Sequence, residues 1–144
     1  METKTVLLPR PAHDCVRIAD GVAWIGGFRC SDCGAVTADQ TLACRRCASR
    51  TPLQPFRASE RGRVYTWSVV ERSYPGVAVP FFSVIVDLSD GLTLKGTLRD
   101  VDIDAAPAGM PVSLVFDDAG GARDASGAPF VGFHFVPRAE TANE

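Results

Sequence analysis

Histidine is scarce in this chain of 144 residues, which contains only His13 and His134. The sequence also lacks a nucleophile elbow, a P-loop and a dinucleotide-binding fingerprint. His134 lies between two phenylalanines in a strand-like segment, where a structural or partly exposed side chain is the expected role. These absences remove the common catalytic signatures, and we do not expect a stand-alone enzyme.

Long hydrophobic runs are missing as well. No apolar run approaches the roughly 20 residues of a membrane-spanning helix, and the apolar stretch near the N-terminus is too short for a signal-peptide core. The chain is 46% hydrophobic, which is typical of a soluble globular protein. Paired cysteines without a secretory signal indicate metal ligands in a reducing compartment, so we expect a cytoplasmic protein.

Four of the five cysteines form two CxxC pairs separated by ten residues: Cys30, Cys33, Cys44 and Cys47. Two such pairs can place four thiolates around one tetrahedral zinc ion. A small residue follows each pair, Gly34 and Ala48, which suits a tight turn that brings backbone amides toward the sulfurs. Four cysteines fill all four coordination positions, and no histidine lies in or next to the motif to suggest an open, catalytic site. The predicted zinc is therefore structural. The fifth cysteine, Cys15, has no evident base nearby and is expected to be inert and half-buried.

The remaining sequence predicts a mainly β protein, an N-terminal zinc ribbon followed by a five-stranded OB-fold barrel. Five segments rich in β-branched and aromatic residues are the expected barrel strands, residues 63–70, 81–88, 92–98, 111–116 and 130–136. Five strands with a break after the third match a Greek-key barrel of the OB type, and a half sandwich is the alternative. The expected organisation has four parts: an irregular N-terminal arm 1–21, a zinc ribbon 22–56, an OB-fold 57–138 and a disordered tail 139–144.

Charge is unevenly distributed along the chain. Residues 1–86 carry eleven Lys and Arg against seven Asp and Glu, whereas residues 87–144 carry four against ten. Six arginines fall within residues 45–63, where Glu60 is the only acidic residue. This segment is either a solvated surface or a patch that faces the anionic groups of a cofactor, a nucleic acid or a partner protein.

Tyr65 and Trp67 alternate along the first barrel strand, as the stacking residues of single-strand-binding OB folds do. The strand-rich half is acidic, however, and the sequence pI is about 5.7, which argues against nucleic-acid binding. We therefore expect both side chains to pack in the core. The aspartates 100, 102 and 104 lack the glycine and glutamate of a calcium loop and are expected to be solvated turn residues.

The segment between the first two barrel strands is unusually apolar for a loop. Its prolines lower the entropy cost of ordering it against another protein. It either contacts a partner or folds back over the end of the barrel, and both interpretations stay open. The candidate partner-binding residues are Tyr74, Pro75, Val77, Pro80 and Phe81.

The order of these motifs resembles the DUF35 family over roughly residues 22–137. The matching segments are the two cysteine pairs at 28–34 and 43–47, the strand 62–70, residues 79–81 and 84–88, the strand entry 109–112, and the aromatic close 133–137. An evident amphipathic helical hairpin before the ribbon, found in much of the family, is missing here, so the resemblance does not extend to a helical arm.

The resemblance implies a non-catalytic accessory subunit that binds a thiolase-like CoA-ester enzyme. That partner would be a lipid-transfer-protein-like aldolase or lyase of steroid side-chain type, a thiolase or an acyltransferase in a hetero-oligomer, and it would provide the catalytic residues. Residues 74–82 and 92–96 look most like family members paired with such aldolases. A MaoC-like enoyl-CoA hydratase is the alternative partner, and single-stranded nucleic acid is the second alternative.

A CoA ester shared with the partner is a further implication of the resemblance. CoA presents a pyrophosphate and a 3′-phosphate, which arginine binds through paired hydrogen bonds. Arg61, Arg63 and Lys95 flank the expected barrel and are the candidate CoA-binding residues.

Overall fold

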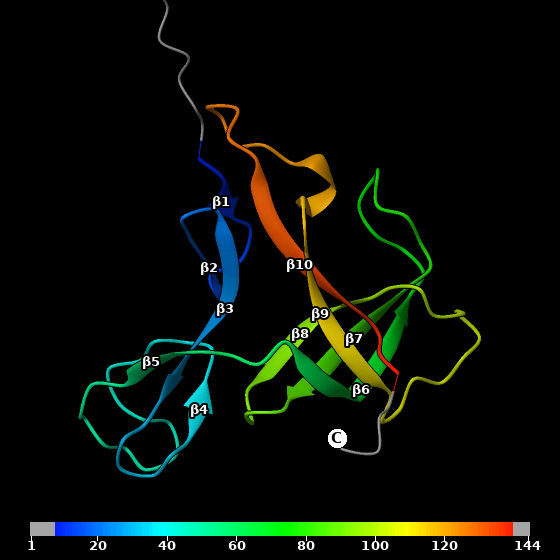
Figure 1. Ribbon diagram of the computed structural model, residues 1–144. Coiled ribbons are helices and arrows are strands. Elements are labelled where there is room, and N and C mark those ends of the chain that lie inside the picture. The colour runs from blue at the N-terminus through cyan, green and yellow to red at the C-terminus, as the bar shows by residue number, and fades with distance from the viewer. Residues whose placement is uncertain (1–7, 140–144) are drawn as a thin grey trace, which may run out of the picture.

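The computed structural model describes residues 8–139, which form β-strands joined by turns and loops (Figure 1). No helix in this described part is long or apolar enough to cross a membrane. The strands and a single 3-10 helix, η1, are β1 (Arg10–Pro11), β2 (Val16–Ala19), β3 (Val22–Arg29), β4 (Val36–Thr37), β5 (Gln54–Arg57), β6 (Arg61–Val70), β7 (Phe81–Leu88), β8 (Thr93–Leu98), β9 (Pro111–Asp117), η1 (Ala119–Gly121) and β10 (Phe130–Pro137).

Strands β6 to β10 close into a barrel. Their hydrogen-bonded order is β6-β7-β8-β10-β9, and β9 returns to pair with the start of β6. β10 runs parallel to β8 and antiparallel to β9, which is the crossover expected of an OB fold. The five predicted strands are confirmed, and closure excludes the half sandwich.

The barrel forms because its strands alternate apolar and polar residues, which places every second side chain inside. On β7 the inner residues are Phe82, Val84 and Val86, each no more than 1% exposed. Phe135 on β10 and Val112 on β9 are fully buried against them. Each such side chain stabilises the fold by about 1.5–3 kcal/mol.

The loop after β8 also contributes to the core. Val101 and Ile103 pack against it, whereas Asp100, Asp102 and Asp104 are exposed. The segment consists of turns that place these two apolar side chains against the barrel core. The prediction of solvated aspartates is confirmed.

The expectation of irregular backbone through residue 21 is wrong over the described part, residues 8–21. β2 and β3 form a hairpin whose turn residues, Asp20 and Gly21, both have positive φ (51° and 75°). An Asp-Gly pair is a strong signal for this turn, so the sequence contained the information. β1 adds to the barrel sheet by pairing in parallel with β10. Residues 1–7 and, apart from residue 139, the expected tail 139–144 lie outside the described residues.

β3 continues beyond the hairpin into the cysteine-rich segment, where it pairs with β4 and β5. β5 begins at Gln54, at the end of this segment. The cysteine-rich segment has its own small buried cluster, which is separate from the barrel core and consists of Phe28, Leu53, Cys30 and Cys44.

The prediction that Tyr65 and Trp67 pack in the core is wrong, because Tyr65 is 71% exposed and Trp67 is 37% exposed. The register of β6 against β7 shifts between Val64 and Thr66. Tyr65 is the extra residue of this β-bulge, so the two aromatic residues do not follow the simple alternation that the sequence suggested.

Gly62 gives a test of how tightly β6 and β7 pack. A Cβ atom at Gly62 would lie 2.4 Å from the backbone oxygen of Asp87, whereas one at Gly26 would meet only the flexible Arg17 side chain, at 2.9 Å. We expect Gly62→Ala to lower the free energy of unfolding by about 2–3 kcal/mol and Gly26→Ala to lower it by less than about 1 kcal/mol. Urea unfolding of both variants measures the difference; equal losses would contradict the tight approach.

Candidate functional site

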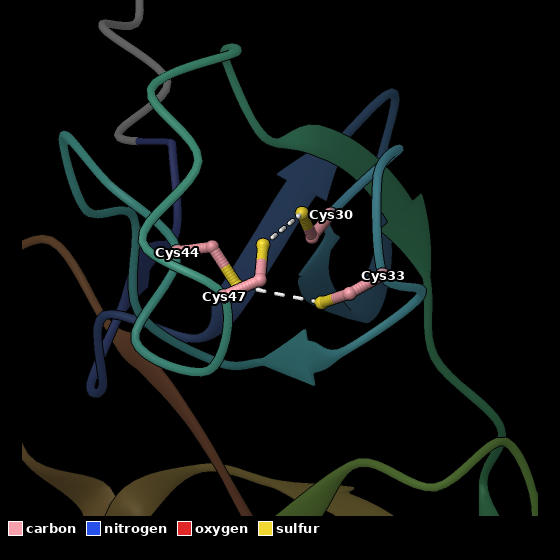
Figure 2. Close-up of side chains that lie close together, drawn as sticks. All are labelled: Cys30, Cys33, Cys44 and Cys47. Carbon is pink, nitrogen blue, oxygen red and sulfur yellow. Dashed lines mark hydrogen bonds between the residues drawn. The ribbon is translucent and has the colours of Figure 1, made fainter.

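The four paired cysteines converge on one point in the segment that contains β4 and β5 (Figure 2). All four sulfur atoms lie within 4.8 Å of one another, with 3.7 Å between those of Cys30 and Cys47 and 3.6 Å between those of Cys33 and Cys44. Four sulfurs at about 2.3 Å from a central ion, in a tetrahedron, would be separated by about 3.8 Å. The cluster therefore has the size needed to hold a metal ion.

Each cysteine pair lies on a turn of the same shape. In the first turn the N–H of Gly34 donates to the carbonyl of Cys30, and in the second that of Ala48 donates to the carbonyl of Cys44, both at 2.9 Å. Gly34 and Ala48 both have positive φ, 77° and 64°. This explains the small residue after each pair, because a larger or branched side chain is strained in that backbone conformation.

Within the cluster, the pKa of Cys44 is lowered and that of Cys47 is raised. The backbone N–H groups of Cys47 and Arg46 lower the pKa of Cys44 to about 6. The N–H of Ser49 lowers the pKa of Cys47, but desolvation and the neighbouring sulfurs outweigh it and raise that pKa to about 12. Four thiolates at this separation repel one another, and a bound cation is the usual way to stabilise them together.

The core around the cysteines is small. Its buried apolar side chains are Phe28 and Leu53, which stabilise the segment by about 1.5–3 kcal/mol each. Ordering the residues from Cys30 to Leu53 costs about 1 kcal/mol or more per residue. Val36 and Ala38 add partly buried contacts with the barrel core, but burial around the cysteines alone is too weak to hold this part of the chain folded.

Cys15 and His134 have structural surroundings. Cys15 lies outside the cluster, packed against the barrel core, and burial raises the pKa of its thiol. His134 Nδ1 lies 2.7 Å from the Asp117 carboxylate, which also accepts from the N–H of Ala119. Desolvation raises the pKa of Asp117, but these two hydrogen bonds outweigh it and the pKa is lowered. His134 thus joins β10 to the end of β9, as a structural residue would.

Two of the three candidate CoA-binding residues lie together. Arg61 and Arg63 line a cleft of about 450 Å³ that also contains Arg138, Asp87 and Ser89. Arg138 follows β10, more than 70 residues along the chain, and no local signal in the sequence connects it to the other two.

Lys95 lines a different cleft, beside Thr66 and Trp67 on the β6–β8 face of the barrel. The other arginines of the basic segment are also dispersed. Arg45 lies 3.6 Å from the Asp39 carboxylate, and the guanidinium of Arg57 lies 6.0 Å from the centre of the Trp24 ring. The arginines of this run therefore have different surroundings.

The apolar loop between β6 and β7 extends away from the barrel (Figure 1). Every residue from 71 to 80 is exposed, including the candidate partner-binding residues Tyr74, Pro75, Val77 and Pro80, whereas Phe81 is half-buried. The loop does not fold back over the barrel end. Three side chains of the loop and two of the adjoining strand are apolar and exposed, and they are called here the β6–β7 surface: Trp67, Val69, Tyr74, Val77 and Val79.

Relatives of known description share parts of this architecture. The sequence model of the ChsH2 C-terminal OB-fold domain matches residues 57–117. A DUF35 domain-containing scaffold protein of Methanocaldococcus jannaschii is 31% identical over 93 residues, covering 62% of this chain and 65% of that protein. The benzoylsuccinyl-CoA thiolase subunit BbsA of Geobacter metallireducens is 32% identical over 79 residues, covering 55% of this chain and 53% of BbsA.

Among solved structures, the Ltp2-ChsH2(DUF35) aldolase superposes with a TM-score of 0.63 and 24% identity over 79% of this chain and 84% of that one. At this identity the likeness establishes the fold. The chain spans somewhat less than two thirds of the scaffold protein and about half of BbsA. This chain is therefore similar to proteins of the DUF35 family, in the sequence of its barrel and in its fold.

Proposed function

We propose that this chain is a non-catalytic accessory subunit that binds and supports a thiolase-like CoA-ester enzyme. The observation that carries the proposal is the β6–β7 surface, where apolar side chains are exposed on a loop that the barrel does not need for its own core. Exposed apolar patches of this kind are typical of association sites. The names of the relatives support the partner class: one is a thiolase subunit, another is a scaffold protein, and the matching structure is an aldolase.

In this proposal the reaction takes place on the enzyme subunit. The partner is a carbon–carbon lyase of the aldolase type, a thiolase or an acyltransferase, and it supplies the catalytic residues. This chain contributes a rigid barrel that presents the β6–β7 surface. A MaoC-like hydratase is the alternative partner, and the identity of the enzyme that co-purifies with the chain decides between them.

The cysteine cluster fits a structural zinc ion held by Cys30, Cys33, Cys44 and Cys47. Four thiol donors at tetrahedral separation are the ligand set that structural zinc sites use. With all four positions filled by protein, the ion would supply folding free energy and leave no position for a substrate. Its role would be to hold the lower part of β3 against β4 and β5.

A second proposed site is the arginine cleft. Arg61, Arg63 and Arg138 give it an excess of positive charge over Asp87, which suits the phosphates of a CoA ester shared with the partner. Lys95, in the neighbouring cleft, extends the same face of the barrel. The cleft is open to solvent, as a site completed by a second subunit would be.

The β6–β7 surface is tested by charge substitution. Val77 is 46% exposed in the loop, and Val22, at 51% exposed, is a matched valine at the start of β3. We expect Val77→Asp to weaken binding of the co-purifying thiolase-like subunit at least about tenfold, because an apolar contact residue at an interface centre contributes more than about 1 kcal/mol. Val22→Asp should bind like the wild type. Calorimetry measures both, and unchanged affinity of the Val77 variant would move the interface elsewhere.

One observation favours single-stranded nucleic acid as the second candidate: Tyr65 and Trp67 are exposed on the barrel. Binding to oligonucleotides that weakens steeply with salt would support this candidate. We expect no such binding, because ten of the fourteen charged residues after residue 86 are acidic.

Metal removal should affect the two parts of the chain differently, because their cores are separate. We expect one zinc ion per chain by atomic emission, lost in Cys44→Ser and retained in Cys15→Ser. The Cys44 variant should lose protection of the amides between Cys30 and Leu53 from hydrogen exchange and keep that of β7 and β10. If the amides of β7 and β10 also lost their protection when zinc is lost, the two cores would not be independent.

The arginine cleft is tested by CoA titration. We expect Arg63→Ala to weaken CoA binding about tenfold in calorimetry, since a hydrogen bond to a charged group contributes about 1.5 kcal/mol or more. The Arg63 guanidinium also donates to the carbonyl of Gly109, so the variant's unfolding curve is the control for a local structural effect. Arg61→Ala should show the same loss, and unchanged affinity in both would remove the cleft from the CoA site.

A further inference from the structure

Strand β6 has a second neighbour along only part of its length. β9 pairs with it at Arg61, Gly62 and Arg63. The next residue, Val64, donates to the carbonyl of Met110 and accepts from the N–H of Gly109, both at 3.0 Å. From Tyr65 to the end of the strand, β7 is the only partner of β6 within residues 8–139. The second half of β6 is therefore an open sheet edge.

The direction of the backbone groups on this edge follows from Val64. Because its N–H and C=O bond to the 109–110 segment, they point away from β7, and its pairing with Val86 is of the kind without direct hydrogen bonds. In an antiparallel ladder such pairs recur at every second residue. The residues of β6 that lie opposite positions 84 and 82 of β7 should therefore also direct their N–H and C=O groups away from β7.

These two positions of β7 are Val84 and Phe82, and they lie opposite Trp67 and Val69. Trp67 and Val69 thus direct their N–H and C=O groups to the open side. The bulge determines which residues have this orientation. Without the extra residue, the neighbouring residues of β6 would direct their N–H and C=O groups to the open side instead. The open edge presents four backbone groups, flanked by two apolar side chains that are 37% and 42% exposed.

The edge lacks the features that usually prevent strand addition. Residues 66–70 include no lysine, proline or acidic residue, and the first charged residue is Glu71, after the strand ends. Edge strands of this kind accept extended peptides, with the backbone giving affinity and alternate side chains giving specificity.

We propose that an extended segment of the enzyme subunit pairs with this edge as an added strand, hydrogen-bonded to Trp67 and Val69. The inference rests on the proposed function and specifies how the partner binds. The chain's own 109–110 segment already forms hydrogen bonds with the same edge at Val64. The added strand would continue this line of backbone hydrogen bonds along β6. Trp67 and Val69 are apolar, so the segment is uncharged and apolar at its centre, and its flank contacts the β6–β7 loop.

Hydrogen exchange on the complex with the co-purifying thiolase-like subunit tests the pairing directly. The amides of Trp67 and Val69 should exchange at least about tenfold more slowly in the complex than in the free chain, because each gains an acceptor. Unchanged exchange at both amides in a complex that forms would overturn strand addition while leaving the accessory role intact.

A matched pair of substitutions separates the backbone from the side chain. Val69→Pro removes an N–H that β7 does not use, and edge strands tolerate proline at such positions. Val69→Thr keeps the N–H. We expect the proline variant to bind the enzyme subunit at least about tenfold more weakly and the threonine variant to stay within about threefold of wild type. Equal affinities of the two variants would overturn the proposal; if the proline variant unfolds, the exchange measurement decides.

Two other outcomes are informative. A free chain that sediments as a dimer, with the Trp67 and Val69 amides already protected, would assign the edge to a second copy and overturn the proposal. Failure to recover any thiolase-like subunit would contradict the proposed function, and strand addition by that subunit would fall with it.

Discussion

One strand, β3, belongs to both hydrophobic cores of the molecule, and the arrangement of the rest depends on it. Ile25 near its middle is fully buried in the barrel core, and Phe28, three residues later, is buried in the cysteine cluster. A strand advances about 3.3 Å per residue, so the two cores are held about 10 Å apart along a continuous, hydrogen-bonded backbone. The cysteine-rich segment is consequently fixed relative to the barrel by β3 itself.

The two cores differ in what stabilises them. The barrel core has fifteen buried residues in one cluster, Val16 of β2 and Ile25 of β3 among them, and the barrel closes its own hydrogen-bond ladder, so it can fold by burial of apolar surface. The cysteine segment has two buried apolar side chains beside its thiols, and its turns place those thiols at the separation of a metal-ligand tetrahedron. A closed barrel is suited to presenting surfaces to another protein, because the presenting strands do not need to reorganise on binding.

The β-bulge in β6 links the fold to the proposed partner surface. The bulge separates two halves of β6. The first half, with Gly62 and Val64, is tightly packed, whereas the second half has no strand beside its outer edge within the described residues. Trp67 and Val69 lie opposite buried residues of β7 and yet remain partly exposed, since no further layer within residues 8–139 covers them. The same local irregularity therefore leaves both apolar side chains and backbone groups available at the position where the exposed loop begins.

Local patterns in the sequence determined the cysteine cluster and the five barrel strands, because ligand spacing and the two-residue alternation are properties of neighbouring residues. The hairpin at Asp20 and Gly21 was also encoded locally, although an irregular arm was expected over residues 1–21. Other features depend on residues far apart in the chain. Arg138 joins Arg61 and Arg63 only because barrel closure brings the end of β10 beside the start of β6. The exposure of Tyr65 and Trp67 was likewise decided by tertiary structure, because a register shift against β7 and the absence of a covering layer cannot be read from alternation within one strand.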